Sequence, residues 1–145
     1  MFEIEHRGLV EFQENIAYLE RHFPREAKRM LLRVGNKART IVRRKARQLV
    51  NKHTGNYHRS IKRGKVFEER NSNRDLTVRV YSSSRVAPHA HLIERGHRIV
   101  DKYGQEHGFK QGYFVFDSAK AEIERDFDSI IIAEFDKALS RLQRG

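Results

Sequence analysis

The segment from Pro24 to Val50 constrains the fold more than any other part of the chain. Its apolar residues fall within one arc at ~100° per residue, which predicts an amphipathic helix roughly 40 Å long. Gly35 interrupts the helix and marks either a bend or a close approach of another backbone. The arc ties the helix to a hydrophobic core through Ala27, Met30, Leu31, Val34, Ala38, Ile41, Val42 and Leu49.

Two further helices are predicted from the same spacing. One covers about residues 8–22, and Pro24 ends it and can serve as the first residue of the long helix. Its apolar stripe consists of Leu9, Phe12, Ile16, Leu19 and Phe23. The other begins with Asp117 or Ser118 as N-cap and continues to about residue 143. Its stripe consists of Ala119, Ile123, Phe127, Ile130, Ile131, Phe135, Ala138, Leu139 and Leu142.

The segment between these helices, about residues 61–116, has the pattern of a small antiparallel sheet. Val66 and Phe67 begin a strand, residues 69–75 form a turn or flexible loop, and alternating apolar residues from Leu76 to Val80 form a second strand. Together they predict a hairpin. The segment 89–95 is ambiguous between helix and strand. The hydrophilic segment 101–112 is expected to be a long loop that is mobile or orders against a partner, and residues 113–116 a short strand.

These elements predict an α+β fold in a single domain over residues 1–145. It consists of an N-terminal helix, a long basic helix, a small antiparallel sheet built on a hairpin, and a C-terminal amphipathic helix. The chain has no cysteine, so a disulfide framework and a thiolate metal site are both excluded. The N-terminus lacks the pattern of a secretory signal, and the longest aliphatic run, Ile130 to Ala133, is too short to span a bilayer.

The positive charge is concentrated on the long helix. The chain has a formal net charge of +11, and the stretch from Pro24 to Lys52 holds eleven Lys or Arg against Glu26 alone, a net of +10. Seven arginines form a stripe opposite or beside the apolar arc: Arg25, Arg29, Arg33, Arg39, Arg43, Arg44 and Arg47. The stripe is either the solvated face of a core helix or a contact surface for carboxylate or phosphate, which arginine binds in a bidentate manner.

Candidate reactive groups do not form a recognisable site. His89 and His91, with Glu94 and His97 nearby, carry ligands that zinc accepts, but their spacing matches no established ligand arrangement. Ser60 lies near two histidines in sequence, yet neither a nucleophile elbow nor paired carboxylates frame it. We therefore predict a protein with no catalytic residue, no metal and no cofactor.

Three segments in order carry more information than any single residue. The long helix ends in H-T-G-N-Y-H-R-S-I (His53 to Ile61), a later segment reads A-P-H-A-H-L-I-E-R-G-H-R (Ala87 to Arg98), and G-Y-F-V-F-D-S-A (Gly112 to Ala119) enters the last helix. This succession resembles the tail-completion family of tailed bacteriophages, also called head–tail joining or minor tail components. The residues that match its motifs are Thr54, Gly55, Ser60, Ile61, Ala87, Ala90, Glu94, Gly96 and, loosely, Phe114 and Ala119.

The sequence also departs from this family pattern. Tyr57 stands where an aliphatic residue is usual, His89 where Tyr is usual and His97 where Thr is usual, and the usual Pro before the last aromatic entry is absent. The resemblance implies a noncatalytic structural virion protein, a homo-oligomer in a ring usually taken to be sixfold. Such a ring lies in the neck of the virion, assembles in the host cytoplasm, and contacts the head connector and the tail tube or terminator proteins.

Two functions remain open for the arginine stripe. In a ring it could contact the acidic start of the last helix in an adjacent subunit, or it could face DNA in the channel. We favour the subunit contact, because strong phosphate binding would impede the passage of DNA. The alternative is a stand-alone nucleic-acid-binding protein that uses helix 24–50, although the sequence shows no stacking platform and no helix-turn-helix spacing. No membrane contact is expected.

Overall fold

The computed structural model describes residues 2–4, 10–51, 54–68 and 76–144, with side chains described from residue 14 onward. It confirms an α+β fold. The elements follow the chain in the order β1 (Phe2–Ile4), α1 (Val10–His22), α2 (Pro24–Leu49), α3 (Asn56–Ser60), β2 (Ile61–Arg63), β3 (Phe67–Glu68), β4 (Leu76–Ser82), α4 (Ala90–Arg95), β5 (Gly96–Val100), β6 (Glu106–Gln111) and α5 (Val115–Arg144).

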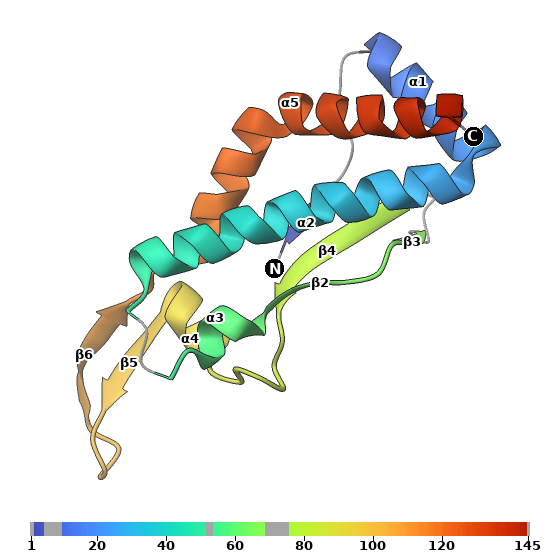
Figure 1. The fold of residues 1–145 in the computed structure, drawn as a ribbon. Helices are drawn as coiled ribbons and strands as arrows, with labels where there is room; N and C mark the ends of the chain where they lie inside the picture. The colour runs from blue at the N-terminus through green and yellow to red at the C-terminus, as the bar shows by residue number, and fades with distance from the viewer. Residues whose placement is uncertain (1, 5–9, 52–53, 69–75, 145) are drawn as a thin grey trace.

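The long helix α2 lies between two layers, with α5 along one side and strands β4 and β2 along the other (Figure 1). Its apolar residues are buried against both, and the core also includes Val78 and Val80 of β4 and Ile131 and Phe135 of α5. Because α2 contributes to both contacts, burial of apolar surface along this one helix holds the layers together.

Two details of α2 agree with the sequence pattern. Pro24 occupies the start of the helix, where its missing N–H has no intrahelical partner to lose. At Gly35 the sheet approaches closely, because a Cβ atom there would lie 3.0 Å from the side chain of Arg63 and 3.2 Å from Val78 Cγ2. The close approach predicted at Gly35 is therefore present, but side chains of the sheet make it, and not another backbone.

Among the predicted core residues whose side chains the structure describes, which leaves out Leu9 and Phe12, three are instead exposed. Phe23 precedes the first residue of α2 and Leu49 is its last residue, while Leu139 follows the buried Ala138 in α5. Ala46, which the arc did not include, is fully buried near the C-terminal end of α2. Helical periodicity located the buried faces correctly but not their limits.

The sheet that faces α2 is antiparallel and centred on β4. Strands β1 and β2 flank β4, and β3 pairs with the start of β4, with Phe67 opposite Thr77. The predicted hairpin is therefore present, and its turn, residues 69–75, falls outside the described residues. Strand β1 was not predicted. Its three residues lie outside the predicted sheet region, residues 61–116, and pair with β4 inside it.

The segment 101–112 is the largest departure from the sequence prediction. Residues Glu106–Gln111 form β6, which pairs with β5 in a separate two-stranded sheet, so the expected long loop is wrong. The ambiguous segment becomes the helix α4. The strand expected at residues 113–116 is also wrong, because Val115 and Phe116 already belong to α5, which begins before both predicted N-cap residues.

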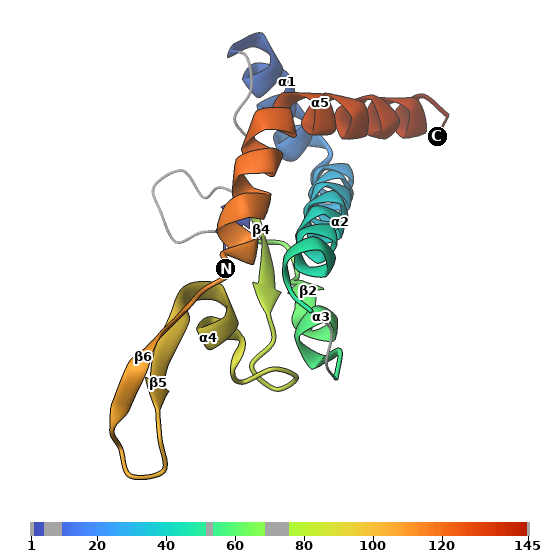
Figure 2. The ribbon, with the colours of Figure 1, turned by 90° about the vertical axis from the view of Figure 1, so that its left-hand side faces the viewer.

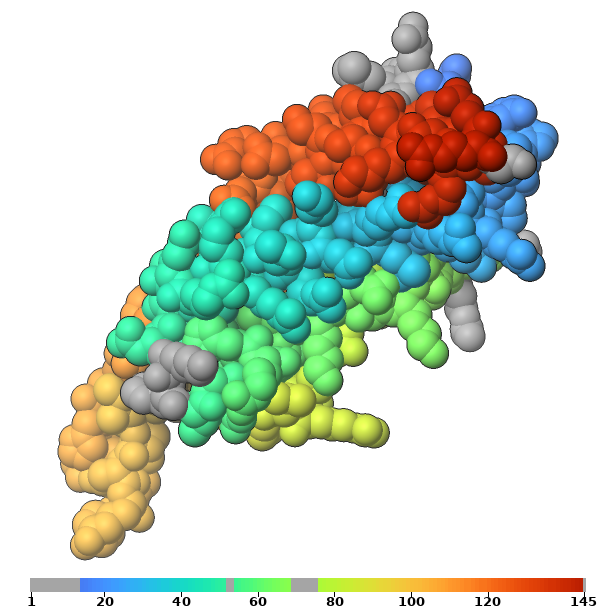
Figure 3. All heavy atoms as spheres, viewed as in Figure 1, coloured from blue at the N-terminus to red at the C-terminus, as the bar shows by residue number. Residues whose placement is uncertain are grey.

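The β5–β6 hairpin projects away from the packed layers (Figure 2). In the space-filling view it extends beyond the rest of the visible surface, while α2 runs across that face between α5 and the segments α3 and β2 (Figure 3). Every residue of β6 is exposed. The molecule thus consists of a packed body, formed by the helices and the sheet centred on β4, and a projecting arm, the β5–β6 hairpin of residues 96–111.

Candidate functional site

The first family-type motif folds into the junction between α2 and the sheet. Gly55 adopts φ +80°, a left-handed conformation that glycine tolerates, immediately before α3. Ser60 donates through Oγ to the Tyr57 carbonyl (2.5 Å) and contacts Ser82 Oγ (2.6 Å), while its own carbonyl accepts the N–H of Ser83 (2.7 Å). Ser60 therefore fastens α3 to the end of β4, and the adjacent Ile61 is fully buried in the core.

The second motif fastens the arm to the body. Glu94 Oε1 accepts the N–H of Phe116 (2.9 Å), which satisfies a donor in the first turn of α5 from a distant element. Gly96 has φ +86°, and a Cβ atom there would collide with the Lys110 carbonyl oxygen. Phe114, at φ +50°, lies at the turn from the arm into α5. These motif residues therefore set where the arm leaves the body.

Two more motif residues, Ala87 and Ala90, lie close to this junction. Ala87 is buried and Ala90 begins α4. Burial, together with the Glu94 carboxylate, raises the pKa of Tyr57 above its ordinary value, and the Tyr57 hydroxyl has no hydrogen-bond partner among the described residues. Tyr57 thus behaves as a packed side chain near the base of the arm.

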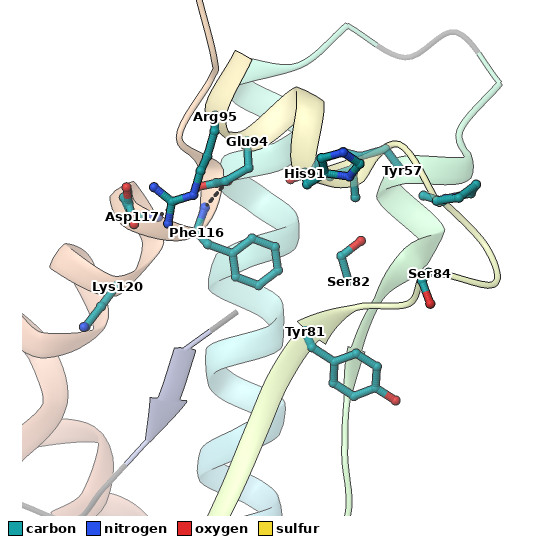
Figure 4. A pocket seen from close by; sticks show the side chains of 13 residues that line it. Tyr57, Tyr81, Ser82, Ser84, His91, Glu94, Arg95, Phe116, Asp117 and Lys120 are labelled. Atoms are coloured by element: carbon teal, nitrogen blue, oxygen red, sulfur yellow. Dashed lines mark hydrogen bonds between the residues drawn. The ribbon is translucent and has the colours of Figure 1, made fainter. Parts of the chain in front are cut away.

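A pocket of about 520 Å³ opens at this junction (Figure 4). Its wall combines apolar and aromatic surface with the charged side chains of Glu94, Arg95, Asp117 and Lys120. The elements α3, α4, β4 and the start of α5 all contribute. Three of the motif residues, Ala87, Ala90 and Glu94, therefore line a concave surface at the base of the arm.

The arm itself exposes an unusual amount of apolar surface. Tyr103 is 81% exposed and Phe109 is 59% exposed, and Ile99 and Val100 are also on the surface. At the tip, Asp101 Oδ1 accepts the N–H groups of Tyr103 (2.9 Å) and Gln105 (3.0 Å), and His107 Nε2 lies 2.7 Å from Asp101 Oδ2. The bond to His107, followed by the backbone bond from Gln105, lowers the pKa of Asp101.

Beyond its base, the arm is held together by contacts between its own two strands. Its two strands pair only with each other among the described residues, and Arg98 forms an exposed ion pair with Glu106 (2.8 Å). An ordered hairpin with exposed apolar residues and two free strand edges is typical of a surface that a partner covers.

A comparison with protein families identifies the chain. The family model described as "Bacteriophage HK97-gp10, putative tail-component" matches residues 11–96, more than half of the 145 residues. The chain belongs to the HK97-gp10-like family of phage tail components. This confirms the resemblance to a family of phage tail components; the third motif, at residues 112–119, lies outside the matched segment. No curated protein and no solved structure matches the chain.

The match to the HK97-gp10-like family ends at Gly96, the first residue of the arm. It includes α2, most of the sheet and the first two motifs. The remaining part of the arm and the whole of α5 lie beyond it. In this member of the family, the matched segment builds most of the body, and the arm extends from its end.

The seven predicted contact arginines do not form one uniform stripe. Arg29 Nη1 pairs with Glu26 (2.9 Å), and Arg44 pairs with Glu122 of α5 within the same chain. Lys45, on the apolar arc, also approaches Glu122. Part of the acidic start of α5, considered above as the contact of a neighbouring subunit, is therefore already neutralised internally.

The other arginines have different environments. Arg43 donates through Nε (3.2 Å) and Nη2 (2.8 Å) to the Ile61 carbonyl, and a nitrogen of Arg33 is buried without a partner among the described residues. Arg25, Arg39 and Arg47 form no ion pair within the described part of the chain. For these five arginines, contact with a carboxylate or a phosphate of another molecule remains a prediction.

Several sites considered from sequence are not assembled. Within the described ranges, no group of three or more His, Asp or Glu is positioned to hold a metal ion. His53 falls outside these ranges, and Ser60 is engaged in the junction described above. None of the described helices is long and apolar enough to cross a membrane.

Sequence reasoning missed the arm and the role of Glu94 at the start of α5. Strand β6 has no alternation of apolar and polar residues, because neither of its faces is buried by the chain. The glycines at residues 96, 104, 108 and 112 were the available signal, since three of them have positive φ in the structure.

Proposed function

We propose that the protein is a noncatalytic structural subunit of the phage neck, which joins the tail to the head connector as a homo-oligomeric ring in the virion. The ring is sixfold, and its axial faces contact the connector on one side and the tail tube or terminator on the other. Membership in a family of phage tail components supports a structural role.

The observation that carries this proposal is the projecting arm. Its exposed apolar residues and free strand edges are a poor surface for a protein that acts as an isolated monomer. A second copy of the chain is the occupant that we favour, because each subunit has the arm and also a pocket at the base of the arm.

Contact between an arm and a different surface of the next copy is a heterologous interface, and repetition of such an interface closes a ring when the rotation permits. The junction residues suit this geometry. Glu94 and Gly96 fix the base of the arm, so its direction relative to the body is defined before assembly. Because the direction of the arm is already defined, assembly loses less conformational entropy than it would with a freely moving arm.

Mass measurement and electron microscopy of the purified protein test the proposal. We expect particles of six copies with a central opening, at subunit concentrations in the micromolar range or after addition of tail tubes, and we expect these particles to cap one end of the tubes. A protein that stays monomeric under both conditions, and that does not bind tubes, would overturn the proposal.

A further inference from the structure

A basic pocket lies where α2 meets α3. It has a volume of about 800 Å³ and is lined by Arg43, Arg47, Val50, Asn51, Gly55, His58 and Arg59. Two arginines come from α2, and a third arginine and a histidine come from α3. No acidic side chain is among the described residues that line it.

The side chains in this pocket are positioned by neutral partners. Arg43 uses Nε and Nη2 on the Ile61 carbonyl, which leaves Nη1 available among the described contacts. Arg59 donates to the side-chain oxygen of Asn56, and His58 donates through Nε2 to the Ala46 carbonyl (3.3 Å). These bonds fix the side chains in place but do not neutralise the charges of the two arginines.

The electrostatic environment of Arg43 agrees with an uncompensated cluster. Burial, and then the neighbouring charges of Arg39 and Arg47, lower the pKa of its guanidinium group. An anion would relieve this repulsion and would accept bidentate hydrogen bonds from arginine. By contrast, Arg29 and Arg44 already have carboxylate partners within the chain.

The arrangement favours a polyanion over a single small anion. Arg39, Arg43 and Arg47 follow one another at four-residue intervals, so they continue the pocket along α2 at a rise of about 6 Å per step. Duplex DNA presents one phosphate charge per about 1.7 Å of its axis, and a row of arginines can follow such a backbone.

We propose that the pocket formed by Arg43, Arg47, His58 and Arg59 binds the phosphodiester backbone of duplex DNA, with Arg39 extending the contact along α2. The choice of DNA as the polyanion rests on the proposed position of the protein in the neck. Contacts with phosphate alone carry no sequence information and weaken steeply with salt. Such salt-weakened contacts differ from the strong phosphate binding that would impede passage, so they guide DNA and still allow it to slide. The subunit contact favoured from the sequence is weakened as an alternative, because Glu122 at the acidic start of α5 already pairs with Arg44 and Lys45 of the same chain.

The test is binding of a fluorescein-labelled duplex of 20 base pairs to the full chain, measured by anisotropy from about 50 to 200 mM salt. Arg47→Gln combined with Arg59→Gln removes two charges from the pocket. The matched control, Arg25→Gln combined with Lys28→Gln, removes two exposed charges from the opposite end of α2. Arg43 is left unchanged, because it also holds the Ile61 carbonyl.

We expect the pocket variant to lose about tenfold or more in affinity and about two units of salt slope, since each lost phosphate contact removes about 0.9. The control should change affinity less than about threefold, because it leaves the pocket intact. Urea unfolding establishes that both variants are folded. An equal loss in both variants would overturn the proposal, as would a parent protein without salt-dependent binding.

A competition experiment separates phosphate from carboxylate. Polyglutamate at the same charge concentration should displace the duplex less effectively than unlabelled DNA does. Equal displacement would overturn the assignment to DNA in favour of an acidic protein. Because these measurements use the isolated chain, they can fail while ring formation succeeds, or succeed while ring formation fails, so the two proposals are tested separately.

Discussion

The packed body and the projecting arm are built on opposite principles. In the body, α2 buries apolar residues against α5 and against β4, so these elements share one core. In the arm, β5 and β6 pair with each other and leave Tyr103 and Phe109 exposed. The body therefore supplies the free energy of folding, whereas the arm presents apolar surface that becomes buried only when another molecule covers it.

The largest expected effect comes from a cavity in the body. Ile131→Ala removes a side chain that is 1% exposed between α5 and α2, and we expect the free energy of unfolding to fall by about 2–5 kcal/mol in urea titration. Ile132→Ala is the matched control, because Ile132 is 41% exposed on the adjacent position and its loss should change stability by less than about 1 kcal/mol. Similar losses in both variants would contradict the assigned core.

A second comparison concerns the base and the tip of the arm. Gly96→Ala places a Cβ atom 2.7 Å from the Gly112 nitrogen, so the hairpin must shift, and amide exchange at Lys110 and Gln111 should accelerate by tenfold or more. Gly104→Ala has a similar φ but open space around it, so it carries only the conformational penalty of about 1–2 kcal/mol. Equal acceleration would show that Gly96 has no steric role.

A third substitution tests the joint between the arm and the body. Glu94→Ala removes the acceptor for the Phe116 N–H, and we expect a loss of about 0.5–2 kcal/mol in the free energy of unfolding, as for a lost helix cap. Glu106→Ala breaks an exposed pair within the arm and should cost no more than about 1 kcal/mol. A larger effect from Glu106 than from Glu94 would reverse the proposed division of roles.

The smallest expected effect is a local response of the arm to acid. The pKa of Asp101 is lower in the folded state than its ordinary value of about 3.9. Ionised Asp101 therefore stabilises the tip of the arm fully above that ordinary value. This stabilisation is lost as the pH falls further, through the folded-state pKa. Amide exchange at Tyr103 and Gln105 should accelerate in that range before the body unfolds. In Asp101→Asn the pH dependence should disappear; its persistence would exclude Asp101 as the cause.

The sequence predicted the parts of the fold that the chain itself buries. The stripes of α2 and α5 and the alternation at Leu76–Val80 arise from burial within one molecule, so their periodicity is present in the residues. Strand β6 is exposed on both faces, and no periodicity marks it. The cap from Glu94 to Phe116 joins residues 22 positions apart, and local sequence rules for helix starts do not extend that far.

The candidate site was predictable only in part for the same reason. The motif residues were found from a pattern. That Glu94, Gly96 and Phe114 meet at the base of the arm depends on tertiary contacts. The arginines were found from charge. Which of them have an ion-pair partner among the described residues, as Arg44 does, and which do not, as Arg47, depends on where α5 and α3 pack. A helical wheel does not contain that information.

The central claim is that the arm serves assembly and not the stability of the subunit. Tyr103→Ser combined with Phe109→Ser tests it directly, with particle mass measured over a range of concentrations and urea unfolding measured in parallel. The account predicts an unfolding transition like that of the parent together with loss of the ring. A variant that forms rings as the parent does would contradict it.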